Sequence, residues 1–239
     1  MRYIDYDRLE GLDPVTYQNQ DPYPWVNPEG ILTPEGFDTL RENLPDVSIF
    51  QKVFGTPRRA GQAPHDRFTL EYTSNTPVYG PWKEFIEELA ADRYRRTLCR
   101  LLGVEGLDFN FHWHYTPNGC SVSPHCDAKR KLGSHIFYLN TDEDWNADWG
   151  GETVVLDDNG RFDTNSAPEF EDFDRAMPSE TMGNRSFIFS RQGNSWHGVR
   201  EINCPEGYMR KVFIVVLNRR KSAWSRWKSK WRPGAVQRF

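Results

Sequence analysis

Five short apolar runs follow one another between residues 108 and 218, and no helical pattern separates them. In the first run Phe109, Phe111, Trp113 and Tyr115 stand at every second position, which is the period of a strand with one buried face. The later runs read HIFYLN, ETVVL, SFIFS and KVFIVVLN, with clusters of Gly, Asn and Asp between them. Many short strands in series favour a β-sandwich or a jelly roll over a parallel α/β sheet. The sequence therefore predicts a mainly β fold.

The N-terminal part of the chain, residues 1–105, is expected to form helices and irregular segments that pack on this β core. Thr33, Pro34 and Glu35 supply an N-cap, a proline at the first helical position and an early acidic residue. These signals predict a short helix that ends near Leu44, just before a second proline.

A single longer helix is predicted from Pro81 to Gly103, because its acidic residues come early and its arginines late, as the helix dipole favours. The apolar residues at helical spacing in it are Trp82, Phe85, Ile86, Leu89, Leu98, Leu101 and Leu102. Farther along, residues 157–180 are rich in acidic and turn-forming residues and are expected to form a long loop inserted into the β core, residues 106–218. Loops of that length in a compact domain are usually functional or mobile.

Length and composition describe an ordinary globular chain. Its 239 residues are 37% hydrophobic and 27% charged, which predicts one soluble domain. The N-terminal sequence MRYIDYDRLEG is charged where a secretory segment would be apolar, so a cytoplasmic location is expected. The four cysteines form no CxxC pair and are expected to be reduced, structural thiols.

The C-terminal tail, residues 219–239, differs in charge from the rest of the chain. It holds eight Lys or Arg and no acidic residue, whereas the remainder carries 22 basic against 34 acidic residues, a balance of −12. Trp224, Trp227 and Trp231 share one helical face among these cations, which is typical of weak contact with an anionic membrane. The alternative is docking on this domain or self-association through residues 222–232, and no nucleic-acid partner is expected for so acidic a body.

Two polar residues in SPHCDAK suggest a metal site. His125 and Asp127 are two positions apart, so in extended chain both side chains leave on the same side and can reach one ion. A second imidazole, His197, follows the strand-like run SFIFS. Two imidazoles and one carboxylate on one face of an octahedral ion, with open positions opposite, are the ligands of non-haem Fe(II) oxygenases.

A rival metal site could use the HxH pair of His112 and His114. A cupin-type manganese or iron site would need a glutamate four or five residues later, where Asn118 and Gly119 stand. We therefore expect His112 and His114 to pack against the helices, on the opposite face of the strand from Tyr115. His135 is expected to be structural. For His65, in APHDRF, a place at the rim of the pocket is an option that no other residue of the motif supports.

The order of motifs around these residues resembles the Fe(II)/2-oxoglutarate-dependent dioxygenases, particularly the prolyl-hydroxylase-like branch of bacterial oxygenases. Tyr115 lies ten residues before His125 in YTPNGCSVSPH, and an apolar strand ending in YLN precedes a Trp and a Gly-Gly pair. The distal half, SFIFSRQGNSWHGVREINCPEGYMRKVFIVVLN, reads strand, histidine, turn and arginine before the last strand. The resemblance covers about Phe109 to Asn218 and implies a double-stranded β-helix core.

The resemblance also implies the ligands. His125, Asp127 and His197 would bind Fe(II), while Arg210 and Tyr138 would hold the distal carboxylate of 2-oxoglutarate. A planar guanidinium can hold a carboxylate through two parallel hydrogen bonds, which lysine cannot do. Dioxygen is the second cosubstrate, succinate and CO2 are the products, and ascorbate is expected to stimulate turnover.

Rival basic residues flank the expected arginine. Arg200 is too close to the distal histidine to lie in the last strand, and Lys211 should point to the opposite face of the strand from Arg210. Val212 stands where the family often has a Ser or Thr that helps to bind the carboxylate, and Ser134 is expected to supply the missing donor.

Tyr115 is expected to line the pocket near the iron, also by resemblance. Because the carboxylate ligand Asp127 is present, hydroxylation is favoured over halogenation, which in this family goes with its loss. The expected substrate is a small molecule, a sugar or a polysaccharide precursor, and Lys129, Arg130 and Lys131 raise the option of an anionic one. The alternatives are a prolyl or peptidyl hydroxylase and a non-catalytic jelly-roll binding module.

Overall fold

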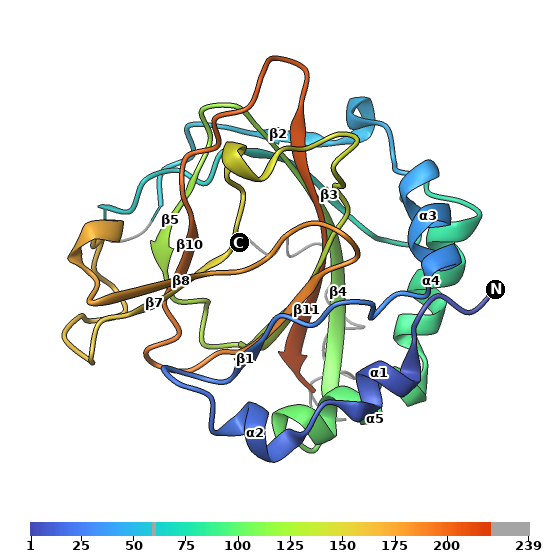
Figure 1. Cartoon of the computed structure of the whole chain (residues 1–239), viewed down its shortest axis with the longest axis horizontal. Helices are drawn as coiled ribbons and strands as arrows, with labels where there is room; N and C mark the ends of the chain where they lie inside the picture. Colours follow the sequence, from blue (N-terminus) through green and yellow to red (C-terminus); the bar gives the residue numbers. More distant parts are fainter. Residues whose placement is uncertain (59–60, 221–239) are drawn as a thin grey trace, which may run out of the picture.

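The computed structural model describes residues 1–58 and 61–220, and their strands form two antiparallel sheets (Figure 1). The larger sheet has seven strands in the order β1-β9-β6-β11-β4-β3-β2, and the smaller has four in the order β5-β10-β7-β8. The helices lie on the far side of the larger sheet from the smaller one. This arrangement confirms the predicted mainly β jelly roll with flanking helices.

The bounds of the strands follow the expected runs for β4, β6, β7, β9 and β11. The larger sheet contains β1 Trp25–Val26, β2 Gln51–Val53, β3 Arg67–Glu71, β4 Leu107–Pro117, β6 Lys131–Tyr138, β9 Ser186–Ser190 and β11 Met209–Arg219. The smaller sheet contains β5 Val122–His125, β7 Val154–Asp157, β8 Arg175–Pro178 and β10 His197–Val199.

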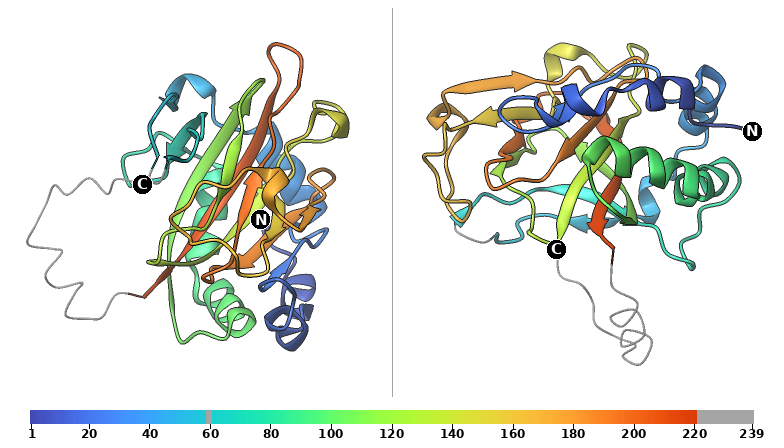
Figure 2. Two further views of the ribbon diagram at one scale, coloured as in Figure 1. Left: turned by 90° about the vertical axis from the view of Figure 1, so that its left-hand side faces the viewer. Right: turned by 90° about the horizontal axis from the view of Figure 1, so that it is seen from below.

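Five α-helices occur in the described N-terminal region and form the outer layer (Figure 2). They are α1 Tyr6–Gly11, α2 Pro14–Gln18, α3 Pro34–Glu42, α4 Pro81–Ala90 and α5 Asp92–Leu102. Thr33 caps α3 as predicted, because its hydroxyl accepts a hydrogen bond from the backbone N–H of Gly36 at 3.1 Å. None of the helices in the described residues is long and apolar enough to span a bilayer.

The single helix expected between Pro81 and Gly103 is wrong in one respect: it is two helices. Ala91 adopts an extended conformation with ψ of 159° and separates α4 from α5. The apolar stripe changes phase there, because Leu89 is buried but Arg93, one turn later, is not, and burial resumes at Tyr94. A break lets both helices turn an apolar side to the same sheet.

Two segments expected to be irregular contain strands. Within residues 1–105, β1 lies at one edge of the larger sheet and β3 and β2 at the other. Within the 157–180 insertion, β8 pairs with β7 along its whole length, and Arg175 Nε donates to Asp157 Oδ2 at 2.9 Å. These edge strands are short and partly exposed, so their apolar alternation is too weak to read from sequence.

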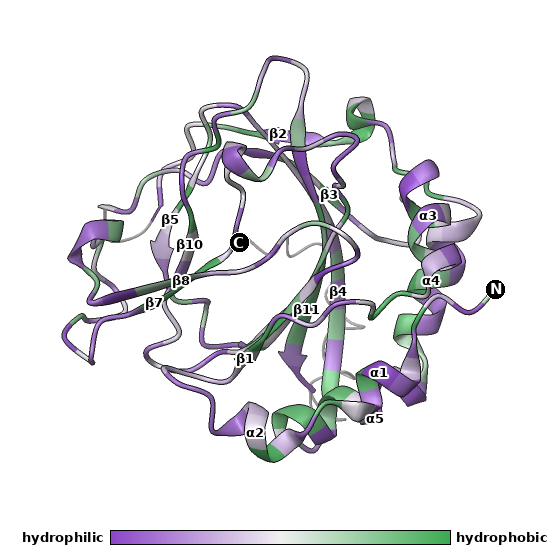
Figure 3. Ribbon diagram, viewed as in Figure 1, coloured by the Kyte–Doolittle hydropathy of each residue, from purple (hydrophilic) through white to green (hydrophobic). Residues whose placement is uncertain are grey.

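Both faces of the larger sheet are buried, one under the helices and one under the smaller sheet. On β4, Trp113 and Tyr115 point to the helices, and the Trp113 ring lies 5.1 Å from that of Trp82 in α4. Apolar residues accordingly recur along β4, β11 and the helices that face them (Figure 3). Register places His114 opposite Val212, which in turn is opposite Tyr138, so these side chains share the inner face.

The expectation that His112 and His114 pack against the helices is therefore wrong. The alternation along β4 was assigned correctly, but its two faces were exchanged. His135 on β6 is structural, as expected, and lies on the helix side, where its Nδ1 and the Tyr94 hydroxyl are hydrogen bonded at 2.8 Å. The tail segment 222–232, with its membrane and self-association hypotheses, lies outside the described residues.

His135 should make the fold sensitive to acid. Burial lowers its pKa from 6.5 to about 3, so below pH 6.5 the unfolded chain takes up a proton that the folded chain refuses. Its contribution is complete above pH 6.5 and falls by about 1.4 kcal/mol per pH unit as pH drops toward 3. We expect His135→Gln, which keeps an acceptor for Tyr94, to flatten the fall in unfolding free energy between pH 6 and 4. The unfolding free energies of wild type and His135→Gln are measured by urea denaturation at each pH. An equal fall with pH in the two proteins would contradict this prediction.

Candidate active site

Strand pairing brings two histidines together between the sheets. His125 ends β5, His197 begins β10, and the two residues are direct partners in the antiparallel ladder. Their ring centroids are 4.4 Å apart. Asp127 follows two residues after β5, and one ligand atom from each of the three lies within 4.8 Å of the others. All three are less than a tenth exposed, so the site is withdrawn from solvent.

Each imidazole is held so that one nitrogen faces the centre of this group. His125 Nδ1 lies 3.0 Å from the carbonyl oxygen of Ser123, and His197 Nδ1 lies 3.0 Å from that of Ser195. A carbonyl can only accept, so Nδ1 carries the proton and Nε2 keeps its lone pair. Burial lowers the pKa of both rings below the usual value, which keeps them neutral and able to bind a metal.

The carboxylate of Asp127 is charged despite its burial. Burial alone raises its pKa, but the attraction of the Lys131 ammonium group and the hydrogen bond from it oppose this, and the pKa is lowered overall. Lys131 Nζ contacts Oδ1 at 2.8 Å, and Arg191 Nε donates to the backbone carbonyl of Asp127 at 3.0 Å. The second carboxylate oxygen has lone pairs for an ion. Two neutral nitrogens and one anionic oxygen fit the ligand preference of Fe(II).

A second buried group lies on the inner face of the larger sheet. Arg210 of β11 is 7% exposed, and its Nε donates to the carbonyl oxygen of Gly151. Its guanidinium carbon lies 5.5 Å from the centre of the Tyr138 ring. The Tyr138 hydroxyl hydrogen bonds Thr153 Oγ1 and Ser179 Oγ, each at 2.8 Å. A buried cation therefore lies beside a cluster of hydroxyl groups.

The Gly-Gly pair before β7 makes room for this arginine. Gly151 has φ of +96°, which an L side chain rarely adopts. A Cβ there would also lie 3.1 Å from Arg210 Cδ. Burial lowers the pKa of the Arg210 guanidinium, and the nearby Tyr138 hydroxyl partly offsets this.

Strand β7 connects the two groups. Val155 pairs with His197, and Thr153 lies two residues before Val155 in the sequence. At about 3.3 Å per residue the two positions are roughly 7 Å apart, a span that a five-carbon dicarboxylate can bridge. The site can therefore chelate a metal at one end and bind an anion at the other.

Two expected pocket residues lie elsewhere. Tyr115 pairs with Lys211 on the helix side, donates to the carbonyl oxygen of Pro45 at 3.1 Å and contacts Phe50, so its expected place near the iron is wrong. Ser134 shares the face of Tyr138 but pairs with Val216, six residues from the arginine along β11. That is about 20 Å at strand rise, too far to bind the same anion.

The rival cations are engaged elsewhere too. Lys211 Nζ forms an ion pair with Asp144 at 2.9 Å on the face opposite Arg210. Arg200 pairs with Glu171 at 2.8 Å near the surface. Of the three basic residues considered, Arg210 alone joins the buried hydroxyl cluster.

Two residues near the site were missed in the sequence, and a third, His65, was given only the option of the pocket rim. Thr153 and Ser179 contact Tyr138, but they are 26 positions apart and meet only because β7 and β8 pair. His65 lies against the metal site, with its ring centroid 4.6 Å from that of His125 and its Nε2 3.1 Å from Ser123 Oγ. Thr153 could have been found only from its place at the start of the strand ETVVL, directly after the Gly-Gly pair. The sequence around His65 gave no usable signal.

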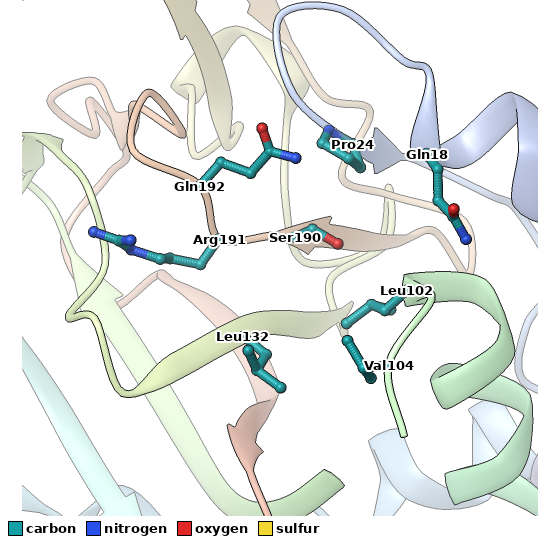
Figure 4. A pocket seen from close by; sticks show the side chains of 8 residues that line it. All are labelled: Gln18, Pro24, Leu102, Val104, Leu132, Ser190, Arg191 and Gln192. Carbon is teal, nitrogen blue, oxygen red and sulfur yellow. The ribbon is translucent and has the colours of Figure 1, made fainter. Parts of the chain in front are cut away.

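A separate cavity of about 320 Å³ lies on the other side of β6 and β9 (Figure 4). Its lining residues are Gln18, Pro24, Leu102, Val104, Leu132, Ser190, Arg191 and Gln192. One of these residues, Arg191, also contacts the metal site, because its Nε donates to the backbone carbonyl of Asp127. None of the ligands lines this cavity.

Comparison with known proteins agrees with this geometry. The profile described as "2OG-Fe(II) oxygenase superfamily" matches residues 110–218. No curated protein sequence matches the chain. The fold is similar to a prolyl-4-hydroxylase from Pseudomonas putida, with TM-score 0.58 and 14% identity over 87% of this chain and 98% of that one.

Two further solved structures share the fold. One is a prolyl hydroxylase of Trichoplax adhaerens in complex with a peptide of a hypoxia inducible factor degradation domain, with TM-score 0.60 and 12% identity over 89% of this chain and 90% of that one. The other is the carbocyclase SnoK from nogalamycin biosynthesis, with TM-score 0.58 and 14% identity over 97% and 96%. At such identities these likenesses show the fold alone.

Fold, ligand set and profile define a non-haem iron oxygenase. Residues 110–218 match the 2OG-Fe(II) oxygenase superfamily, and the triad of His125, Asp127 and His197 in them is intact. The cofactors implied are Fe(II) and 2-oxoglutarate. A jelly roll that had lost its metal site is excluded as a description of this chain.

Metal binding should be measurable without turnover. Mn(II), which does not start the oxidation, should stabilise the wild type by about 2.7 kcal/mol at a hundred times its Kd, a rise of about 5–10 °C in Tm. His197→Ala and Asp127→Ala should lose this shift, because each removes one of three ligands. His135→Gln, outside the site, should keep it. An equal shift in His197→Ala would show that the ion binds elsewhere.

Proposed function

We propose that the protein hydroxylates an unactivated C–H bond of a small molecule, with 2-oxoglutarate as cosubstrate. The observation that carries this is the complete set of His125, Asp127 and His197 beside a buried arginine pocket. Bound Fe(II) supplies the oxygen chemistry, in which 2-oxoglutarate and dioxygen give succinate, CO2 and the hydroxylated product. The carboxylate ligand favours hydroxylation, because halogenation needs its position for a halide. The chain's own residues bind, orient and exclude water.

Arg210 is the residue that would bind the distal carboxylate of 2-oxoglutarate. Its guanidinium is buried and faces Tyr138 and Thr153, with no acidic side chain in an ion pair with it among the described residues. A buried cation without a counter-charge is costly, and a bound carboxylate would offset that cost. Thr153 and Ser179 would supply the hydroxyl groups that Val212 cannot.

Two loops that contact each other beside β5 support a small substrate. The segment before β3 contacts β5, where Ser123 Oγ donates to the carbonyl oxygen of Ala63 at 3.2 Å. The same segment reaches the loop after β7, where Gln62 Nε2 donates to the carbonyl oxygen of Ser166 at 3.0 Å. In Figure 1 these segments lie on the same side of the molecule as β5 and β10. Such cover suits a compact molecule better than a polypeptide strand.

A peptidyl or prolyl hydroxylase is the second candidate, because two of the similar folds are prolyl hydroxylases. A panel of small metabolites, sugars and proline-containing peptides separates the two, with substrate-stimulated succinate formation as the readout. Stimulation by peptides alone would replace the small-molecule assignment.

The activity itself should be detectable before the substrate is known. With Fe(II), 2-oxoglutarate, ascorbate and dioxygen, the wild type should form succinate slowly, because oxygenases of this kind turn over the cosubstrate uncoupled. His125→Ala and Asp127→Ala should reduce the rate at least 100-fold, on the order of the loss that follows removal of an essential group. NMR of the reaction mixture measures succinate. Equal rates in wild type and both variants would refute the assignment.

The cosubstrate pocket can be tested by KM for 2-oxoglutarate. Arg210→Lys should raise KM about 10–100-fold, because two parallel charge-assisted hydrogen bonds are replaced by one. Thr153→Val should raise it about 2–10-fold through loss of one hydroxyl. Ser134→Ala is the matched control and should leave KM unchanged. A larger effect at Ser134 than at Thr153 would place the carboxylate at the other end of β6.

A further inference from the structure

Two arginines near the iron ligands have no use in the cosubstrate pocket. Arg67 begins β3, and Arg58 lies in the segment before it. The Nε atoms of both are buried and make no hydrogen bond within the described chain. The adjacent carboxylate, Asp66, accepts instead from the backbone N–H of Gly55 at 2.8 Å. Both guanidinium groups therefore retain unused donors.

Strand register directs Arg67 into the space between the sheets. On β3, Phe68 pairs with Tyr115 on the helix side and Thr69 pairs with His114 on the inner side. Since side chains alternate along a strand, Arg67 points inward with Thr69. Its Nη1 also donates to the carbonyl oxygen of His65 at 2.6 Å. The ring of His65 in turn contacts that of His125.

Arg58 is close enough to the iron ligands to affect them. Burial lowers the pKa of its guanidinium, and the nearby Asp127 carboxylate partly offsets this. Arg58 also acts on Arg67, whose pKa falls to about 10, first because of burial and then because of Arg58. The two cations thus lie near each other, on the β3 side of the triad, whereas Arg210 lies on the β7 side.

Two neighbouring, partly buried guanidinium groups that form no close ion pair within residues 1–58 and 61–220 are unfavourable until an anion joins them. Guanidinium groups fit the oxygens of carboxylates and phosphoryl groups through paired hydrogen bonds. The basic turn that first suggested an anionic substrate does not reach this place: Lys129 and Arg130 are exposed, and Lys131 is engaged with Asp127.

We propose that the substrate of this oxygenase carries an oxyanion, a carboxylate or a phosphoryl-type group, which Arg58 and Arg67 bind together beside the iron ligands. The proposal rests on the proposed function, because it assigns these arginines to the substrate of that reaction. The bound anion would fix the distance between the reacting carbon and the metal, so the two arginines would select which C–H bond is oxidised.

The test uses the full chain loaded with Fe(II) and saturating 2-oxoglutarate under anaerobic conditions, so that Arg210 is already occupied. Sodium sulfate, a tetrahedral oxyanion, and sodium acetate are each compared with sodium chloride at equal ionic strength. Sulfate, acetate or both should raise Tm by about 2–4 °C at concentrations several times the dissociation constant. Arg58→Gln and Arg67→Gln should each abolish the rise, and Arg67→Lys should restore part of it.

Arg93→Gln is the matched control, because Arg93 forms an ion pair with Glu10 on the distant helix layer and should leave the rise unchanged. A sulfate rise without an acetate rise indicates a phosphoryl-type group, and a rise with acetate indicates a carboxylate. Equal rises in wild type, Arg58→Gln and Arg67→Gln would mean a general salt effect and overturn the proposal.

A second readout separates substrate from cosubstrate. The absorption band of the anaerobic Fe(II)–2-oxoglutarate complex gives the dissociation constant of 2-oxoglutarate directly. If Arg58→Gln and Arg67→Gln weaken this binding tenfold or more, both arginines belong to the cosubstrate site and the proposal fails. Succinate formation by the wild type without any anion effect in Tm would leave the oxygenase function standing and remove only this inference.

Discussion

The pairing of His125 with His197 across β5 and β10 is the contact on which the rest of the site depends. It brings residues 72 positions apart into one ladder, fixes both rings through backbone carbonyls and places Asp127 beside them. The smaller sheet has only four short strands, and their order places β10 between β5 and β7. β7 extends the same sheet toward Arg210 and thereby sets the distance between metal and anion pockets.

Much of the core was predictable because every second side chain of a strand lies on the same face of the sheet. The two ligands of the HxD motif were predictable for the same reason, since an extended chain is enough to bring both side chains to one ion. The missing information was which face is inner. Both sides of the larger sheet are buried, so alternation groups Trp113 with Tyr115 and His112 with His114 but does not say which pair meets the helices. The exchange of those faces moved Tyr115 out of the pocket.

The hydroxyl partners of Tyr138 could not be found by the same means. Thr153 and Ser179 meet through an edge strand, β8, whose side chains are mostly exposed and whose sequence resembles a loop. Ser134 was predicted in their place because it lies on the same face of β6 as Tyr138. It lies too far along the strand from Arg210, which the alternation of faces does not reveal. Helix signals had the matching weakness: caps and the dipole fixed where α4 begins and α5 ends, whereas the break at Ala91 follows from fitting two helices to a twisted sheet.

The ion pair between Lys131 and Asp127 has a consequence for how the protein matures. Many small metal-binding domains are unfolded without their ion, because the free energy of metal binding is also the free energy of folding. Here the ammonium group, four residues along the chain from the carboxylate, already balances its charge, and the imidazoles are neutral. The polypeptide can complete its architecture first and acquire iron afterwards, which suits a metal that is exchanged or lost during the life of the protein.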